Sequence, residues 1–552
     1  MKLKVFNFAI IFLLSIVLWV VGPQPLFAQQ TLYPSHFVVG NPYSNFDLSP
    51  DGRKVVITDN SLRQTRVLIK SVDPNTADRF LDINDARPLA AQWATNERLI
   101  VPVMTVTDMK LPKGIYAVHD NKRDKYLRNI VTARMPAIDE DGSNPVMMFE
   151  KTSKALQLNI NLAQLVSPLI KDPDHIIMSA FDKTLGVYKV NIQTGKAKRL
   201  SAGRSDTRAW HVNPDGIPNM RIDARDDFRK ARVYARLDGT KRWKKIKTIE
   251  HQDIRGIIPL PAMDDPNAFY IAARPDGQDR TGIYHYYPDN GRFGDPVFTH
   301  PNYDLDSPVF SASGDYMGAR YIENRKIYDS QNDVHTQAMA RLRLELRDDI
   351  SVDILDTSDD MSVWLISLSG PTEPGRVAIF NIKTAALTTI HIINSKLKPK
   401  DLTVPKPVNF TARDGTPLSG YLTRKNGVAA SAPLIVMPHG GPESRDYWSY
   451  DLIAQYFVSQ GYQIFQPNFR GSSGFGEAFV KAGHREWGGL MQDDITDGVQ
   501  HLIATGQANQ GNICIAGSSY GGYAALMGAV KTPALYNCAV AINAPSDFGR
   551  YD

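Results

Sequence analysis

Cysteine is scarce in this chain, because only Cys514 and Cys538 occur among its 552 residues. No cysteine lies near the N-terminus, so a lipid anchor on an N-terminal cysteine is excluded. Two cysteines do not make a disulfide framework, and no Cys/His spacing suits zinc. A disulfide needs close, aligned β-carbons, which a sequence does not establish. We expect both cysteines to act as small buried apolar side chains, and we predict no metal and no cofactor.

A large excess of one charge is also missing. Lysine and arginine number 63 and aspartate and glutamate 58, which gives a net charge of +5. Two of these lysines, Lys2 and Lys4, lie in the targeting segment described next, so a processed chain carries a smaller surplus. This balance argues against a nucleic-acid partner. The hydrophobic content of 43% is ordinary for a globular protein, and the length predicts two or more domains.

Residues 1–28 have the pattern of a secretory signal peptide. Lys2 and Lys4 precede an apolar stretch from Val5 to Val21, and Leu26-Phe27-Ala28 offers a small residue at a cleavage point. We expect cleavage after Ala28, hence a periplasmic or secreted protein with no membrane partner after cleavage. The alternative is an uncleaved anchor, because the stretch reaches the low end of the length that spans a membrane.

The segment Gly517-Ser518-Ser519-Tyr520-Gly521-Gly522 fits Gly-x-Ser-x-Gly, the nucleophile elbow of α/β-hydrolases. A short apolar run at 512–516 predicts a buried strand before it, and residues 520–530, rich in small side chains, predict a helix after it. A helix N-terminus behind Ser519 favours developing negative charge. The sequence therefore predicts Ser519 as a nucleophile, the alternative being a chance match in a loop.

A second segment predicts the oxyanion hole. The strand-like run 433–438 leads into His439-Gly440-Gly441-Pro442, and hydrolases take one backbone donor from such a loop. We predict the N–H groups of Gly441 and Tyr520 as the two donors, with Gly440 as the alternative to Gly441. We expect His439 to order the loop by hydrogen bonding and not to act as the general base.

The sequence offers Ser519 no base. In α/β-hydrolases the acid and the histidine follow the serine, but none of the twelve histidines lies beyond Ser519. We therefore expect that the triad aspartate and histidine lie beyond this chain, that it is a fragment truncated at the C-terminus, and that it is inactive as it stands.

Three motifs together resemble the prolyl oligopeptidase family. They are His439-Gly440-Gly441-Pro442, the segment 468–476 (Asn-Phe-Arg-Gly-Ser-Ser-Gly-Phe-Gly) and the segment 517–523 around the elbow. The branch most similar is that of the acylaminoacyl-peptidases and dipeptidyl-aminopeptidases. The resemblance implies a serine peptidase in which a β-propeller caps an α/β-hydrolase domain. It implies Ser519 as nucleophile, Gly441 and Tyr520 as oxyanion donors, and a peptide as substrate.

Residues 29–400 predict a β-propeller. Short strand patterns alternate with polar turns, as in Leu48-Ser49-Pro50-Asp51-Gly52 before the apolar run 54–57. Related turns recur farther along the chain; three of the steps between them are 41 to 45 residues and the other two are nearer double that. A four-stranded blade takes about 40–50 residues. We predict about seven blades, with six or eight as alternatives, and an irregular array of β-sandwiches as the other reading.

Residues 401–552 predict an incomplete α/β-hydrolase domain after a polar linker at 395–400. Asp414-Gly415 between two apolar runs indicates a hairpin. Runs at 434–438, 462–466, 512–516 and 538–542 alternate with helical stretches, which predicts a mostly parallel sheet covered on both faces. Two other functions stay open: an esterase on the same catalytic domain, and a non-catalytic protein whose propeller binds peptides.

Overall fold

The structure of the chain is a computed structural model, and it describes most residues from Leu32 to Ser546. The described ranges are 32–61, 65–81, 83, 86–110, 117–119, 122–150, 152, 163–169, 171–224, 230–236, 242–250, 260–262, 264–265, 267–275, 277–311, 316–330 and 332–546. The predicted signal peptide, residues 1–28, lies outside them. Among these described ranges, no helix has the length and apolar character needed to cross a membrane.

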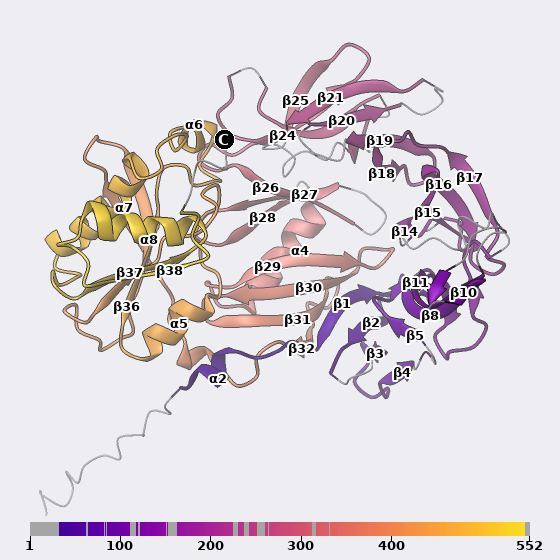
Figure 1. Cartoon of the computed structure of the whole chain (residues 1–552), viewed down its shortest axis with the longest axis horizontal. Helices are drawn as coiled ribbons and strands as arrows, with labels where there is room; N and C mark the ends of the chain where they lie inside the picture. The colour runs from indigo at the N-terminus through magenta and orange to yellow at the C-terminus, as the bar shows by residue number, and fades with distance from the viewer. Residues whose placement is uncertain are drawn as a thin grey trace, which may run out of the picture.

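Small antiparallel sheets follow one another along residues 43–392 and around a ring (Figure 1). The first holds β1 (Tyr43–Leu48), β2 (Lys54–Asp59), β3 (Arg66–Ser71) and β4 (Arg79–Leu81). The next region holds a sheet of β6 (Gln92–Trp93), β7 (Arg98–Ile100), β12 (Pro136–Asp139) and β13 (Val146–Met147). Beside it lie a sheet of β5 (Ala86–Pro88), β8 (Val103–Lys110) and β11 (Tyr126–Arg134), and a ribbon of β9 (Ala117–His119) and β10 (Lys122–Asp124).

Five further sheets complete the ring. The first two are β14 (Gln164–Ser167), β15 (His175–Asp182), β16 (Thr184–Asn191) and β17 (Ala197–Ser201), and then β18 (Thr207–Val212), β19 (Pro218–Ala224), β20 (Lys230–Ala235) and β21 (Lys244–Glu250). The third is β22 (Leu260–Pro261), β23 (Phe269–Ala273), β24 (Gly282–Tyr287) and β25 (Arg292–Phe298), and the fourth is β26 (Leu305–Phe310), β27 (Tyr316–Ile322) and β28 (Lys326–Ser330). The last is β29 (Ser351–Thr357), β30 (Val363–Gly370), β31 (Glu373–Asn381) and β32 (Leu387–Ile392).

The turn before β2 shows why these strands form where they do. Ser49 Oγ donates to Asp51, and Gly52 adopts a left-handed φ of +72° that closes the turn. The β-branched run that follows forms β2 with a buried face. The predicted turn-then-strand unit is confirmed here.

The ring closes where its last sheet meets its first. Leu48 and Val55 of the first sheet share a buried apolar cluster with Leu365 and Val377 of the last. The Leu48 N–H also donates to Asp356 Oδ2 at 2.9 Å. This closed arrangement agrees with the predicted propeller; the number of blades stays a prediction, as does the boundary between residues 400 and 401.

The remaining strands build one six-stranded sheet in the order β33-β34-β36-β35-β37-β38. Its strands are β33 (Lys406–Thr411), β34 (Pro417–Thr423), β35 (Leu434–Val436), β36 (Gln463–Asn468), β37 (Ile513–Ser518) and β38 (Cys538–Ile542). The hairpin β33–β34 is antiparallel, whereas β36, β35, β37 and β38 run parallel. The predicted hairpin and the four predicted strands are confirmed.

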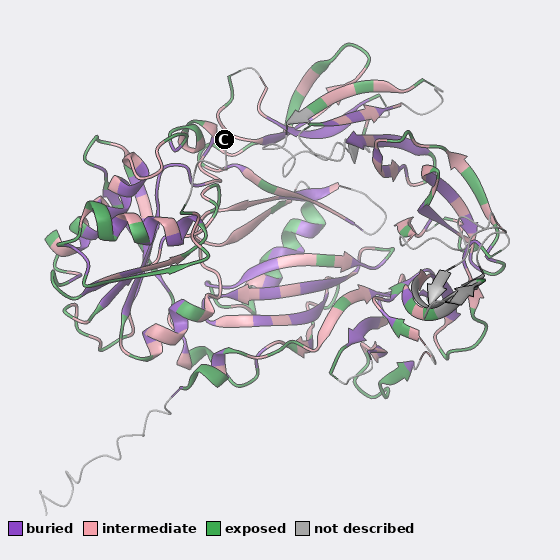
Figure 2. Ribbon diagram, in the orientation of Figure 1, coloured by how far each residue is buried: buried purple, intermediate pink, exposed green. Residues whose placement is uncertain are grey.

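Helices cover both faces of this sheet. The helices of the described chain are α2 (Pro34–Phe37), α4 (Asp333–Leu344), α5 (Leu452–Ser459), α6 (Glu477–Lys481), α7 (Leu490–Ala504) and α8 (Tyr520–Lys531), with a 3₁₀ turn at η2 (Pro399–Asp401). Residues of α7 and α8 pack with the sheet in the largest buried cluster, while Ala454 and Val458 of α5 pack against Ile435 and Ile464 on the other side. Figure 2 shows the central strands of this sheet as buried, among them β35 and β36.

Candidate active site

Ser519 lies at the junction of β37 and α8, with its side chain exposed. Its backbone has φ +55° and ψ −123°, a conformation that residues with a β-carbon rarely adopt. The Ser519 N–H donates to the Ile542 carbonyl at 2.9 Å, and the Tyr523 N–H donates to the Ser519 carbonyl at 3.0 Å. The surrounding backbone therefore fixes the serine in the strained turn that defines a nucleophile elbow.

Two glycines allow this turn to be so tight. A β-carbon on Gly517 would overlap the backbone of Gly521, and one on Gly521 would overlap the Pro438 carbonyl. Helix α8 can thus approach both β37, the strand that precedes it, and the end of β35. The spacing of glycines in the motif is therefore explained by close backbone packing.

The loop after β35 passes directly beside the serine. A β-carbon on Gly440 would lie 3.5 Å from Ser519 Cβ, and Gly441 has a φ of +125°. Within the described residues, the N–H groups of Gly441 and Tyr520 donate to no other protein group. Free backbone donors beside an exposed serine are what an oxyanion hole requires.

His439 orders this loop. Its Nδ1 donates to the Gly440 carbonyl at 2.9 Å, its Nε2 lies 2.9 Å from Ser472 Oγ, and its ring stacks on Phe469 with centroids 4.4 Å apart. Burial lowers the pKa of His439 to about 4. Both ring nitrogens face partners other than Ser519, which fits the predicted ordering role. In the part of the chain that the structure describes, no histidine or carboxylate is hydrogen-bonded to Ser519 Oγ.

Aromatic rings and a buried ion pair pack beneath the candidate site, on the inner side of Ser519. The Tyr520 ring is buried against Trp487 and Phe469, with centroids 4.7 and 5.2 Å away. Arg470 makes bonds of 2.7 and 2.8 Å to both oxygens of Asp494 on α7, and these bonds raise the pKa of Arg470. The structure shows an ion pair, and it is buried.

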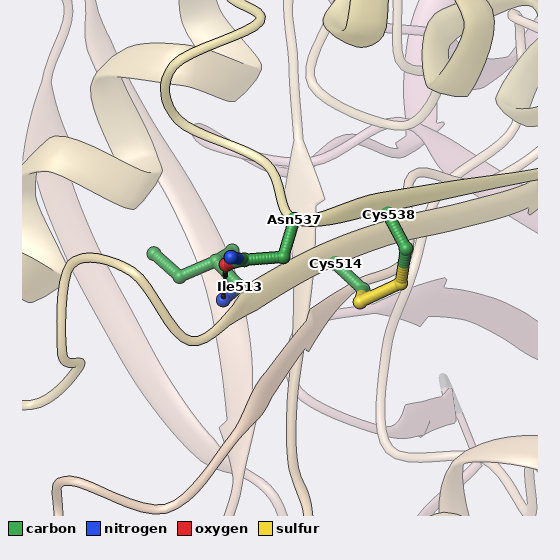
Figure 3. The surroundings of a disulfide bond; sticks show 4 residues. All are labelled: Ile513, Cys514, Asn537 and Cys538. Atoms are coloured by element: carbon green, nitrogen blue, oxygen red, sulfur yellow. Dashed lines mark hydrogen bonds between the residues drawn. A yellow bond between two sulfur atoms is a disulfide. The ribbon is translucent and has the colours of Figure 1, made fainter.

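The expectation for the cysteines is wrong. Cys514 and Cys538 form a disulfide, with Cα atoms 4.7 Å apart, and Cys538 is exposed (Figure 3). The reason is register, because β37 and β38 run parallel with Cys514 opposite Cys538. The neighbouring pair adds two bonds: the Ile513 N–H donates to Asn537 Oδ1 at 3.1 Å, and the Asn537 N–H donates to the Ile513 carbonyl at 2.7 Å. The disulfide thus joins β37, which leads into Ser519, to β38, whose Ile542 carbonyl accepts from the Ser519 N–H.

A cavity of about 1340 Å³ lies between the ring and the six-stranded sheet that leads into Ser519, named the catalytic sheet after the family it resembles. Its walls include strands β23, β24 and β26 on the ring side, and the loop from Glu443 to Tyr447 and helix α6 on the other. The sequence did not predict which residues line this space, since they come from segments more than 100 residues apart. No group of three or more His, Cys, Asp and Glu residues suited to a metal occurs in the described ranges.

The two halves of the molecule are tied together beside this cavity. Arg445 donates to the carbonyls of Ile322 and Glu323, both at 3.1 Å, and its guanidinium lies 4.0 Å from the centroid of the Phe475 ring. The Gly476 N–H donates to Asp304 at 2.9 Å. The loop that follows Gly441, one of the two candidate oxyanion donors, is therefore anchored to the ring of sheets.

The chain resembles known proteins in sequence. The profile of the prolyl oligopeptidase family matches residues 448–552. Dipeptidyl aminopeptidase BIII of Pseudoxanthomonas mexicana is 37% identical over 207 residues, which are 36% of this chain and 30% of that protein. Dipeptidyl peptidase family member 6 of Caenorhabditis elegans is 24% identical over 483 residues, 81% of this chain and 63% of the relative. The chain thus spans less than two thirds of the length of either relative.

Solved structures share the fold. A prolyl endopeptidase superposes with a TM-score of 0.59 at 14% identity, covering 92% of this chain and 73% of the other. A puromycin-hydrolyzing peptidase of Mycobacterium tuberculosis gives a TM-score of 0.57 at 16% identity, covering 92% and 78%. At these identities the likeness concerns the fold, a propeller joined to a hydrolase domain. The segment that matches the model of the prolyl oligopeptidase family, residues 448–552, contains Ser519 and the strained turn that holds it.

Proposed function

We propose that this protein is a serine peptidase that hydrolyses short peptides through an acyl-enzyme. One observation carries the proposal: Ser519 is exposed at a backbone turn with positive φ, beside a glycine loop with free N–H groups. The family and the dipeptidyl peptidases among its relatives support peptides as substrates.

In the proposed reaction, Ser519 Oγ attacks the scissile carbonyl while a histidine base accepts its proton and an acid orients that histidine. The carbonyl oxygen becomes an oxyanion that accepts hydrogen bonds from the N–H groups of Gly441 and Tyr520. Removing one donor of this kind costs about 3–4 kcal/mol of transition-state stabilisation. The leaving amine departs, and water then hydrolyses the acyl-enzyme.

The ring of sheets would limit the size of the substrates that reach Ser519. The cavity lies between it and the catalytic loop, so a folded protein would be excluded while a short or unstructured peptide would enter. Export through the predicted signal peptide, cleaved after Ala28, would place this activity in the periplasm or outside the cell.

The reaction class can be tested by rates on two substrates. The protein expressed from its whole natural gene, including any codons after that of Asp552, should hydrolyse an aminoacyl anilide faster than a short acyl ester. Ser519→Ala should abolish both activities. A preference for the ester would favour the esterase alternative. Peptide affinity without any turnover would favour a non-catalytic binding protein.

A second part of the proposal concerns the 552-residue chain itself. Since no base is identified for Ser519 among its described residues, the purified chain should not label with a fluorophosphonate serine probe. Stoichiometric labelling of this chain at Ser519 would contradict that part and would mean that a base is present.

A further inference from the structure

The disulfide between Cys514 and Cys538 closes a loop that contains the candidate nucleophile. The two cysteines are 24 residues apart, and the chain between them holds Ser519 and the whole of helix α8. They form the first pair of the ladder between β37 and β38, and Ser518 lies opposite Ile542 at the last pair. A covalent link therefore fixes one end of this strand pair, and Ser519 follows directly after the other end.

A backbone bond at that other end connects β38 to Ser519. The Ser519 N–H donates to the Ile542 carbonyl at 2.9 Å. The serine has the strained φ of +55°, so it keeps this conformation only while its neighbours hold it. A shift of β38 by one residue would remove the bond from Ile542 and would turn the side chains of β38 to the opposite face of the sheet. The register of β38 thus helps to set the position of the serine.

Strand β38 depends on few contacts in the described part of the chain. It pairs with β37 and with no other described strand, and its five residues are all exposed. By contrast, the inner strands β35 and β36 are paired on both sides and are buried. The disulfide and the two hydrogen bonds between Asn537 and Ile513 hold the start of β38 (Figure 3). The register of β38 therefore depends strongly on the covalent link.

The sulfur atoms are open to thiol–disulfide exchange, because Cys538 is exposed and Cys514 is half-buried. A thiolate of a dithiol reductant attacks Cys538 Sγ, and Cys514 leaves as a thiolate. The second thiol of the reductant then releases Cys538. The reductant is oxidised to a disulfide, and the two cysteines take up two electrons and two protons. Export to an oxidising compartment would favour the reverse step, in which a disulfide compound oxidises the pair.

We propose that the Cys514–Cys538 disulfide is a redox-sensitive positioning element for Ser519. In the oxidised form it keeps β38 in the register that places the Ile542 carbonyl on the Ser519 N–H. Reduction frees β38 and slows the chemical step. This inference rests on the proposed function, because it takes Ser519 as the nucleophile. Since the cysteines act through Ile542, their reduction should change turnover more than substrate binding.

Steady-state kinetics of the protein expressed from its whole natural gene tests this proposal, with an aminoacyl anilide as substrate. Reduction with dithiothreitol should lower kcat about tenfold or more, because small displacements of a reacting group have effects of this size. KM should change less than about twofold, and reoxidation should restore kcat. Alkylation and mass spectrometry verify that Cys514 and Cys538 are reduced. An unchanged kcat after this reduction would overturn the proposal.

The double variant Cys514→Ala/Cys538→Ala is the matched control, because it lacks this disulfide and keeps every other group that dithiothreitol could affect. Its kcat should equal that of the reduced parent and should not respond to dithiothreitol. A response as large as that of the parent would place the effect at another group. Circular dichroism at the assay temperature measures the folded fraction of each form. A loss of activity that matches a loss of folded protein would mean that the disulfide only stabilises the fold, and the proposal would be wrong.

Hydrogen exchange of the same protein decides the inference independently of turnover. Reduction should speed exchange of the Ser519 N–H about tenfold or more and should leave the amides of β2, in the ring, unchanged. Unchanged exchange at Ser519 would overturn the proposal. Failure of the proposed function would look different: Ser519→Ala would leave the hydrolysis unchanged, although exchange at Ser519 in the parent would still respond to reduction.

Discussion

The ring of sheets and the catalytic sheet are stabilised in different ways. In the ring, buried apolar residues divide into separate clusters, each shared by one sheet or by adjacent sheets, such as that of Ile176 and Met178 or that of Trp364 and Phe380. In the part built on the six-stranded sheet, one large cluster joins strands β33 to β37 with α7 and α8 and includes Tyr520 beside Ser519. A change in the ring should therefore stay local, whereas a change in the core beneath the six-stranded sheet should reach Ser519.

The largest loss of stability is expected from breaking the buried ion pair between Arg470 and Asp494. Asp494→Ala removes the bidentate partner of the buried Arg470 guanidinium and leaves it the half-exposed Asp414, which should lower the free energy of unfolding by about 3–5 kcal/mol. The control is Asp497→Ala on the same helix, whose partner Arg413 is 51% exposed, and it should cost less than about 1 kcal/mol. Urea unfolding followed by fluorescence measures both, and equal losses would contradict the account.

A smaller effect should appear as a pH dependence. His439 has a pKa of about 4 when folded, below the usual 6.5, so the unfolded chain binds its proton first as pH falls. His439 should therefore lower stability by up to about 3 kcal/mol between pH 6.5 and pH 4, with no effect above that range. The difference between the unfolding curves of the parent and of His439→Gln isolates this contribution. A constant difference across this pH range would show that His439 is not buried as a neutral ring.

The close packing at the elbow gives the next test. Gly521→Ala places a methyl group against the Pro438 carbonyl, and overpacking of this kind costs about 1–3 kcal/mol. Gly40→Ala is the matched control, because its added methyl group meets nothing within 4 Å and its backbone is not left-handed. Thermal unfolding should show a lower midpoint for Gly521→Ala alone. Equal midpoints for the two variants would mean that the loop and helix are less closely packed.

The smallest losses of stability are expected from shortening one buried isoleucine in the ring and one in β37. Ile176→Val in the ring and Ile515→Val in β37 each remove one fully buried methylene, and each should cost about 0.5–1.5 kcal/mol. Hydrogen exchange should separate them, because only Ile515→Val should speed exchange of the Ser519 N–H, which is bonded to Ile542. Faster exchange at Ser519 in both variants would show that the ring and the elbow are coupled.

Much of the catalytic domain was predictable because its signals are local. Apolar runs mark β35 to β38, and the glycines around Ser519 mark the turn that the structure shows. The disulfide was missed because it depends on the register of β37 against β38, which no local pattern reveals. The partners of Arg470 and the lining of the cavity were missed for a similar reason, because they depend on which distant segments the fold brings together.

The measurement that tests the central claim most directly is labelling of the natural gene product with a fluorophosphonate, followed by peptide mapping. We predict that the probe attaches to Ser519 and that Ser519→Ala removes the label. Attachment to a different residue, or equal labelling of the Ser519→Ala protein, would contradict the assignment of Ser519 as the nucleophile.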